Sequence, residues 1–142
     1  MTHSHTELAS LIEGFQQQSL TEAQWTHEAH LLTALHYLSN HDRHTATCLL
    51  RAGIITLNHA LGGVNGPNNG YHETITLFWI AVIDQFVKKQ APNQTPAQLT
   101  DAFLQSRWSD SSLPFQYYSK ERLMSTEAQA IWVEPDLKPF DF

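Results

Sequence analysis

The sequence is poor in cysteine, in charge and in long apolar runs. Cys48 is the only cysteine among 142 residues, so the chain cannot form an internal disulfide. Charged residues make up 15% of the chain, and no basic cluster is longer than the pair Lys88 and Lys89. With a formal net charge of −6, this distribution disfavours nucleic-acid binding. The longest apolar run, residues 77–83, is far shorter than the roughly 20 residues that a membrane span needs, so no membrane partner is expected.

The N-terminus also lacks the features of a secretory signal. Its first ten residues contain neither a basic segment nor an apolar one after it. Together with the single cysteine, this predicts a cytoplasmic protein. The length is that of one domain, residues 1–142, and 42% hydrophobic residues indicate a globular chain. A homodimer is an alternative to a monomer, although no apolar stripe clearly exceeds the needs of one core.

Apolar side chains recur at helical spacing along most of the chain. We therefore predict an all-α fold, a compact bundle of four to five helices with no sheet of more than two short strands. A capping-box pattern from Thr21 to Gln24 indicates the start of the second helix. The expected helices cover residues from His5 or Thr6 to Gln18, then about 21–39, 43–61, 71–89 and 95–106.

The last third of the chain is aromatic and is interrupted by prolines. It predicts at most short helices, at residues 119–124 and 126–132. So many apolar side chains are not expected to stay in solvent, and an irregular C-terminal tail should wrap the bundle. The expected anchors are Tyr117, Tyr118, Trp132 and Phe140.

Histidine is unusually frequent, with 9 residues against 8 lysines and arginines together. On the predicted second helix, His27 and His30 fall on one stripe with Ala34 and Leu38, while His36 points away from it. Helix residues three apart are neighbours on the surface. His27 and His30 can therefore present ring nitrogens to the same metal ion, as paired ligands in helix bundles do.

The stretch "GYHETIT", residues 70–76, supplies a second group of candidates after a glycine-rich loop at residues 62–70. His72 is predicted on the buried stripe of the fourth helix and offers a third imidazole. Glu73 borders that stripe and is either a further ligand or a general base acting on bound water. Nitrogen and oxygen ligands without a thiolate suit Zn²⁺, Fe²⁺, Mn²⁺ or Cu²⁺, and the sequence does not choose among these divalent transition metals. The predicted metal ligands are His27, His30, His72 and Glu73.

Four further side chains are candidates for positioning a small polar or anionic substrate. Arg51 and Asn58, seven residues apart, share one flank of the third helix, and a solvated flank is the alternative for each of them. Tyr71 and Tyr118 could contribute hydroxyl groups. With Glu73 as the base, these residues form the predicted catalytic set of a small metal-dependent enzyme.

Two other interpretations stay open. His72, paired with Glu73 or Glu28, could act as a metal-free acid–base group. Adjacent helix residues diverge, so His72 and Glu73 cannot easily bond to each other. The protein could also be a non-catalytic ligand-binding or interaction module, in which the histidines bond to a ligand or to the core.

The motifs "WTHEAHL", "GYHETIT" and "YYSKERLMS", with "WVEPDL" near the end, resemble an uncharacterised family of small bacterial proteins. The resemblance covers residues 20–137. It implies a site shared with those relatives, but it implies no activity. The residues that it marks are His27, His30, His72, Glu73, Tyr118, Ser119 and Arg122.

Overall fold

The computed structural model describes residues 3–63 and 69–142, and these residues form helices and turns without an extended strand. The predicted all-α bundle is therefore confirmed, while residues 64–68 of the predicted glycine-rich loop lie outside the described residues. The longer helices are α1 (His5–Gln16), α2 (His27–Asn40), α3 (Arg43–Ala60), α4 (Glu73–Lys88) and α5 (Pro96–Gln105). The C-terminal part contains the 3₁₀ turns η1 (Arg107–Ser109) and η2 (Leu113–Gln116) and the short helices α6 (Lys120–Leu123) and α7 (Thr126–Ala130).

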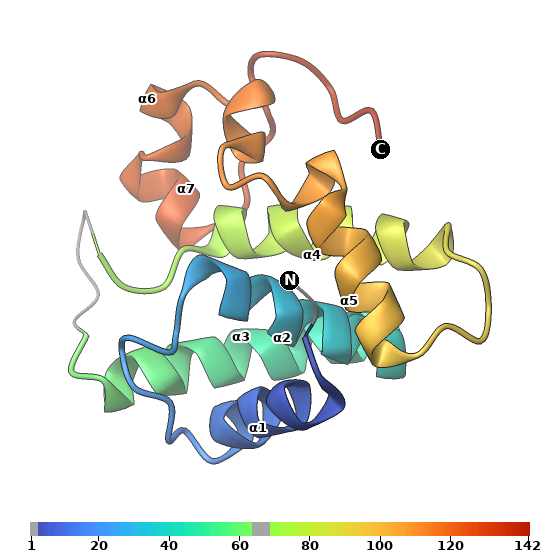
Figure 1. Ribbon diagram of the computed structural model, residues 1–142. Coiled ribbons are helices and arrows are strands. Elements are labelled where there is room, and N and C mark those ends of the chain that lie inside the picture. Colours follow the sequence, from blue (N-terminus) through green and yellow to red (C-terminus); the bar gives the residue numbers. More distant parts are fainter. Residues whose placement is uncertain (1–2, 64–68) are drawn as a thin grey trace.

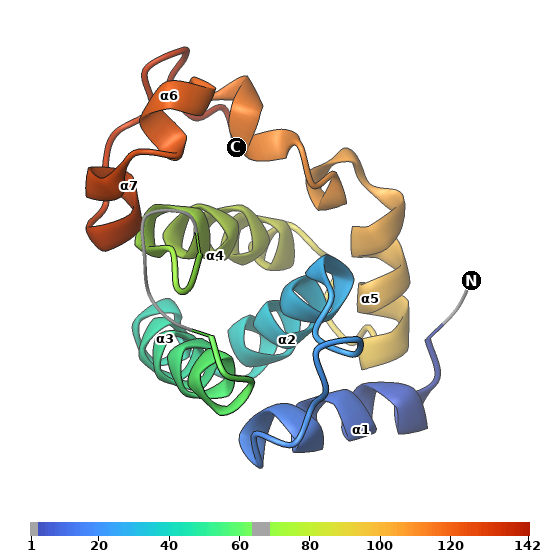
Figure 2. The same cartoon turned by 90° about the vertical axis from the view of Figure 1, so that its left-hand side faces the viewer.

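Helix α4 lies in the middle of the fold. The helices α2 and α3 cover one side of it, with α1 packed against them on the far side from α4, and the segment from η2 to the C-terminus covers the other side (Figures 1 and 2). Its sequence, which contains "LFWIAVI", is apolar almost all round, as expected for a helix with no solvent face. Phe78, Ile80, Val82 and Ile83 are each at most 2% exposed. The predicted buried stripe of this helix was therefore too narrow.

The C-terminal segment is attached to α4 by aromatic packing and by hydrogen bonds between its backbone and the side chain of Thr74. Tyr117 and Tyr118 are fully buried, and both rings contact the ring of Phe78. The Thr74 hydroxyl donates to the carbonyl of Ile131 at 2.8 Å and accepts from the amide of Val133 at 3.2 Å. The predicted aromatic tail over the bundle is thus confirmed.

Helix α1 approaches α3 closely because α3 has a glycine at the contact. A Cβ atom at Gly53 would lie 2.2 Å from Cζ of Phe15, which is too close for two non-bonded carbon atoms. Phe15 is 3% exposed and stacks on Trp25, with 5.4 Å between the ring centroids. The N-terminal helix is therefore packed against the rest of the bundle.

The second helix begins later than predicted. Thr21 and Gln24 do form reciprocal bonds, from the Thr21 amide to Gln24 Oε1 at 2.8 Å and from the Gln24 amide to Thr21 Oγ1 at 3.3 Å. They close an isolated turn, however, and α2 begins at His27 with Thr26 as its N-cap. Trp25 stacks between Phe15 of α1 and His30 of α2, and we infer that this packing outweighs the local capping signal. His27 is exposed as a result, contrary to its predicted place in the core.

The fourth helix begins at Glu73 instead of Tyr71, and His72 is its N-cap. The prediction placed His72 inside the helix, with its ring on the inner stripe. At the N-cap, its Nδ1 instead accepts a hydrogen bond from the amide of Ile75 at 3.1 Å. This change of position decides what the ring can bind.

Candidate functional site

Arg51, Tyr71 and Glu73 form one hydrogen-bonded cluster between α3 and the start of α4. Arg51 donates to both carboxylate oxygens of Glu73, from Nε to Oε1 at 3.0 Å and from Nη2 to Oε2 at 2.8 Å. The hydroxyl of Tyr71 donates to Oε1 of the same carboxylate at 2.6 Å. Bidentate arginine–carboxylate pairs fix both distance and orientation. The three side chains therefore join the two helices in a defined geometry.

The cluster holds its members in fixed charge states. Burial raises the pKa of Glu73, but hydrogen bonds from Arg51 and Tyr71 and the charge of Arg51 outweigh it, so the net pKa is lowered. Burial and the hydrogen bond to Glu73 raise the pKa of Tyr71 to about 12. Glu73 is thus a carboxylate and Tyr71 a neutral phenol near neutral pH. A carboxylate held in this way is a weak proton acceptor, which does not favour the predicted role of Glu73 as a general base.

Both ring nitrogens of His72 are engaged by backbone groups. Nδ1 accepts from the Ile75 amide at 3.1 Å, and Nε2 lies 2.8 Å from the carbonyl oxygen of Leu123, to which it donates. The ring is therefore the Nε2–H tautomer, and its one lone pair is used as the helix cap. Burial lowers the pKa of His72, so the neutral form is favoured. The ring connects the start of α4 to the end of α6.

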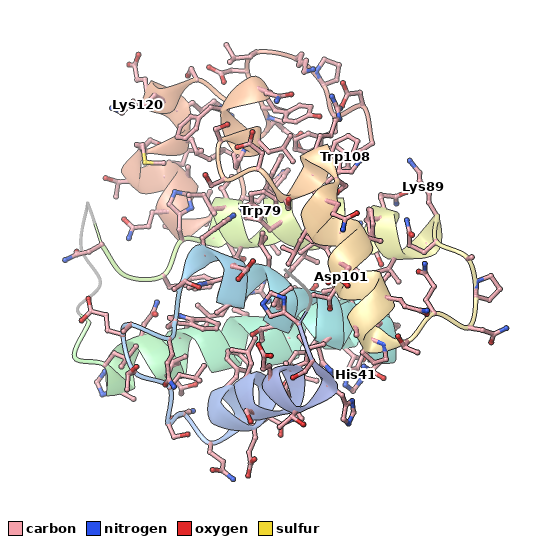
Figure 3. All side chains as sticks on the ribbon, viewed as in Figure 1. His41, Trp79, Lys89, Asp101, Trp108 and Lys120 are labelled. Atoms are coloured by element: carbon pink, nitrogen blue, oxygen red, sulfur yellow. The ribbon has the colours of Figure 1, made fainter. Side chains whose placement is uncertain are left out.

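His30 and His27 lie at the beginning of α2 in different surroundings. His30 stacks on Trp25, with 3.8 Å between the ring centroids, and its Nδ1 donates to the carbonyl of Thr26 at 2.7 Å. The exposed ring of His27 packs edge-on against Trp79 of α4, with 5.3 Å between centroids (Trp79 is labelled in Figure 3). Burial of His30 and the partial covering of the His27 ring lower the pKa of both histidines, and a charge on His27 would lower the pKa of His30 further. The two imidazoles are thus neutral near neutral pH.

The structure does not assemble the four predicted metal ligands. Within residues 3–63 and 69–142, no group of three or more His, Cys, Asp or Glu side chains is arranged to hold a metal ion. His72 faces the backbone of Leu123, and Glu73 faces Arg51. His27 and His30 are the part of the predicted set that shares one helix turn.

The remaining predicted substrate residues are dispersed. Tyr118 is fully buried in the C-terminal segment, where its hydroxyl donates to the carbonyl of Val133 at 2.7 Å. Asn58 is half-buried, and its backbone carbonyl accepts from the amide of Gly63 at 2.9 Å just beyond the end of α3. Of the predicted catalytic set, the structure brings together Arg51, Tyr71 and Glu73.

A groove that the sequence did not reveal is lined by residues of α1, α2 and α5 and by Gln94. Figure 2 shows how these three helices lie relative to one another. The volume of the groove is about 550 Å³, within the range of small-molecule sites. Helix α5 is far from α1 and α2 in the sequence, so no local pattern predicts the groove. The sequence contained one indication of the groove, which was the predicted position of His36 away from the inner stripe of α2. The lining residues are His5, Leu8, Ala9, Ile12, Glu13, Gln16, Leu32, Leu35, His36, Ser39, Asn40, Gln94, Pro96, Leu99 and Thr100.

Comparison with protein-family models, with curated proteins and with solved structures found no match. Among the described residues, no helix has both the length and the apolar character needed to cross a membrane. Function is therefore inferred from the geometry of the chain itself.

Acidification is expected to destabilise the fold from about pH 6.5 downward. Burial lowers the pKa of four histidines, His27, His30, His36 and His72, from the ordinary value of 6.5. Below about pH 6.5 the unfolded chain therefore binds more protons than the folded one. The free energy of unfolding has its full value above this pH and falls as the pH decreases. Glu73, with a pKa lowered from 4.5, stays ionised in this window. Urea unfolding at about pH 7.5 and 5.5 measures the effect, and equal or greater stability at the lower pH would contradict it.

Proposed function

We propose that the protein is a non-catalytic ligand-binding module whose core histidines are structural. The observation that carries this proposal is the engagement of both ring nitrogens of His72 by the Ile75 amide and the Leu123 carbonyl. A metal ion at His72 would have to displace the cap of α4 or the contact with α6. Either loss leaves a partly buried backbone group without its partner, at a cost of up to about 1–3 kcal/mol.

The other polar side chains support the same interpretation. The guanidinium of Arg51 is bound bidentately by Glu73, so an anionic substrate would compete with an existing ion pair. The hydroxyl of Tyr118 is used inside the protein. The groove between α1, α2 and α5, in contrast, offers space for a ligand. A ligand-binding module without catalysis therefore accounts both for the polar side chains that bond within the protein and for the open groove.

The second candidate is the metal-dependent enzyme acting on a small polar or anionic molecule. The observation in its favour is the pair His27 and His30, two neighbouring imidazoles that are neutral near neutral pH. Neutral imidazoles are good ligands for divalent transition metals such as Zn²⁺, Fe²⁺, Mn²⁺ or Cu²⁺. This pair would need its further ligands from substrate or solvent.

Substitutions of His72 test the proposal. His72→Ala removes the cap of α4 and leaves the Leu123 carbonyl without its donor, so we expect a loss of about 2–3 kcal/mol in the free energy of unfolding. His72→Asn restores a capping oxygen and should recover about 1 kcal/mol of this loss. Exposed His59 is the control, and His59→Ala should change stability by at most about 0.5 kcal/mol. Urea unfolding of the untagged proteins gives these values.

Elemental analysis of the same preparations, purified without chelator, separates the two candidates. We expect substoichiometric metal in the wild type and the same content in the His72 variants. Stoichiometric metal in the wild type that disappears from a His27→Ala, His72→Ala double variant would establish the metal-dependent enzyme as the better candidate and overturn the proposal.

A further inference from the structure

We propose that the groove between α1, α2 and α5 binds a neutral amphipathic small molecule, with an apolar body and one hydroxyl or amide group that hydrogen-bonds to His36. This inference rests on the proposed ligand-binding function and deepens it by naming the ligand class. Metal content plays no part in its test, so the two proposals can fail separately.

The apolar body is inferred from the floor and walls of the groove. Leucine and isoleucine side chains come from all three helices, with Leu8 and Ile12 on α1, Leu32 and Leu35 on α2, and Leu99 on α5. Ile12, Leu32 and Leu35 are each less than 10% exposed and form the floor. An apolar group placed here removes hydrocarbon surface from water on three sides, which is the main source of affinity in such sites.

The polar contact is inferred from His36. Its ring lines the groove and is half-buried, and its edge-on contact with Tyr37 has 5.3 Å between the ring centroids. No other described residue forms a hydrogen bond with this ring, whereas His72 and His30 have such partners. A neutral imidazole has one donor and one acceptor nitrogen. A hydroxyl or an amide, which also contains a donor and an acceptor, matches it.

The charge of the ligand is inferred from the charged residues of the wall. Among the described lining residues, none is lysine or arginine, and Glu13 is the one carboxylate. The next polar groups along α2 are Ser39 and Asn40, whose donors already bond to the carbonyls of Leu35 and His36 at 2.6 and 2.8 Å. An anionic head would lose its hydration without gaining a cation and would be repelled by Glu13. A neutral head avoids both costs.

Fluorescence titration with N-phenyl-1-naphthylamine, a neutral apolar probe with one N–H group, measures binding to the groove. Ala9 is exposed on α1 and lines the groove, so Ala9→Trp should fill it and weaken probe binding by about tenfold or more, the effect of losing about 1.4 kcal/mol. Its neighbour Ser10 is also exposed but does not line the groove. Ser10→Trp should therefore bind like the wild type, and circular dichroism of both variants checks that they fold.

Competition against the bound probe tests the head group. 1-Octanol and octanoate carry chains of equal length. We expect 1-octanol to displace the probe at a concentration at least about tenfold lower than octanoate needs. His36→Leu should weaken displacement by 1-octanol by about three- to tenfold, the effect of one lost hydrogen bond. Absence of probe binding, equal binding by the two tryptophan variants, or octanoate competing as well as 1-octanol would each overturn the proposal.

Discussion

Truncation after Leu113 is expected to give an insoluble or molten chain. The deletion removes five side chains that are at most 4% exposed, Tyr117, Tyr118, Leu123, Ala128 and Val133. It also uncovers the side of α4 that these residues cover (Figure 1). An apolar helix face with no covering layer cannot stay in water as part of a uniquely packed protein.

Near-UV circular dichroism, binding of a hydrophobic dye and cooperativity of urea unfolding measure the outcome. Truncation after Val133 is the matched control, since it keeps the five buried side chains and both hydrogen bonds to Thr74. It should remain folded, with stability reduced by the loss of Phe140 and Phe142. If the shorter chain, ending at Leu113, stays soluble and unfolds cooperatively, the tail is not part of the core.

The second large effect is expected at Phe78. Its side chain is fully buried, and its ring contacts aromatic rings of the C-terminal segment, among them Tyr117, Tyr118 and Phe140. Phe78→Ala leaves a cavity at this junction and should lower the free energy of unfolding by about 3–5 kcal/mol. Phe115, in the same segment as the two tyrosines, is 41% exposed and serves as the control.

Urea denaturation of both variants measures the effect. We expect Phe115→Ala to lower the free energy of unfolding by well under half as much as Phe78→Ala does. Similar losses for the two variants would show that the junction between α4 and the tail is not closely packed in solution.

Helical periodicity was sufficient to predict the fold class and most of the helices. The start of α4 and its burial needed information from elsewhere in the chain. Phe78 and Val82 lie in a helix that is apolar on all sides, and local periodicity cannot say that residues after 113 cover its second face. Similarly, the cap at Thr21 and Gln24 is real, but the packing of Trp25 ends it after one turn.

The sequence singled out "GYHETIT" but did not predict the contacts that its residues make. The partner of His72 Nε2 is a backbone carbonyl 51 residues away, at Leu123, and backbone carbonyls leave no trace in sequence patterns. Glu73 contacts Arg51 because α3 packs beside α4, and the local sequence around either residue does not encode this packing. The capping role of His72 had a local signal, its place between a glycine-rich loop and an apolar helix, and a predicted start two residues later, at Glu73, would have revealed it.

The state of the His72 ring is the most direct test of the proposed function. Long-range ¹H–¹⁵N correlation spectra of the untagged protein distinguish the two neutral tautomers and a metal-bound ring, with His72→Asn giving the assignment. We expect His72 as the Nε2–H tautomer, with spectra unchanged after treatment with EDTA. A His72 nitrogen signal that shifts when EDTA removes a metal, together with the signals of His27 and His30, would contradict the structural role of these histidines.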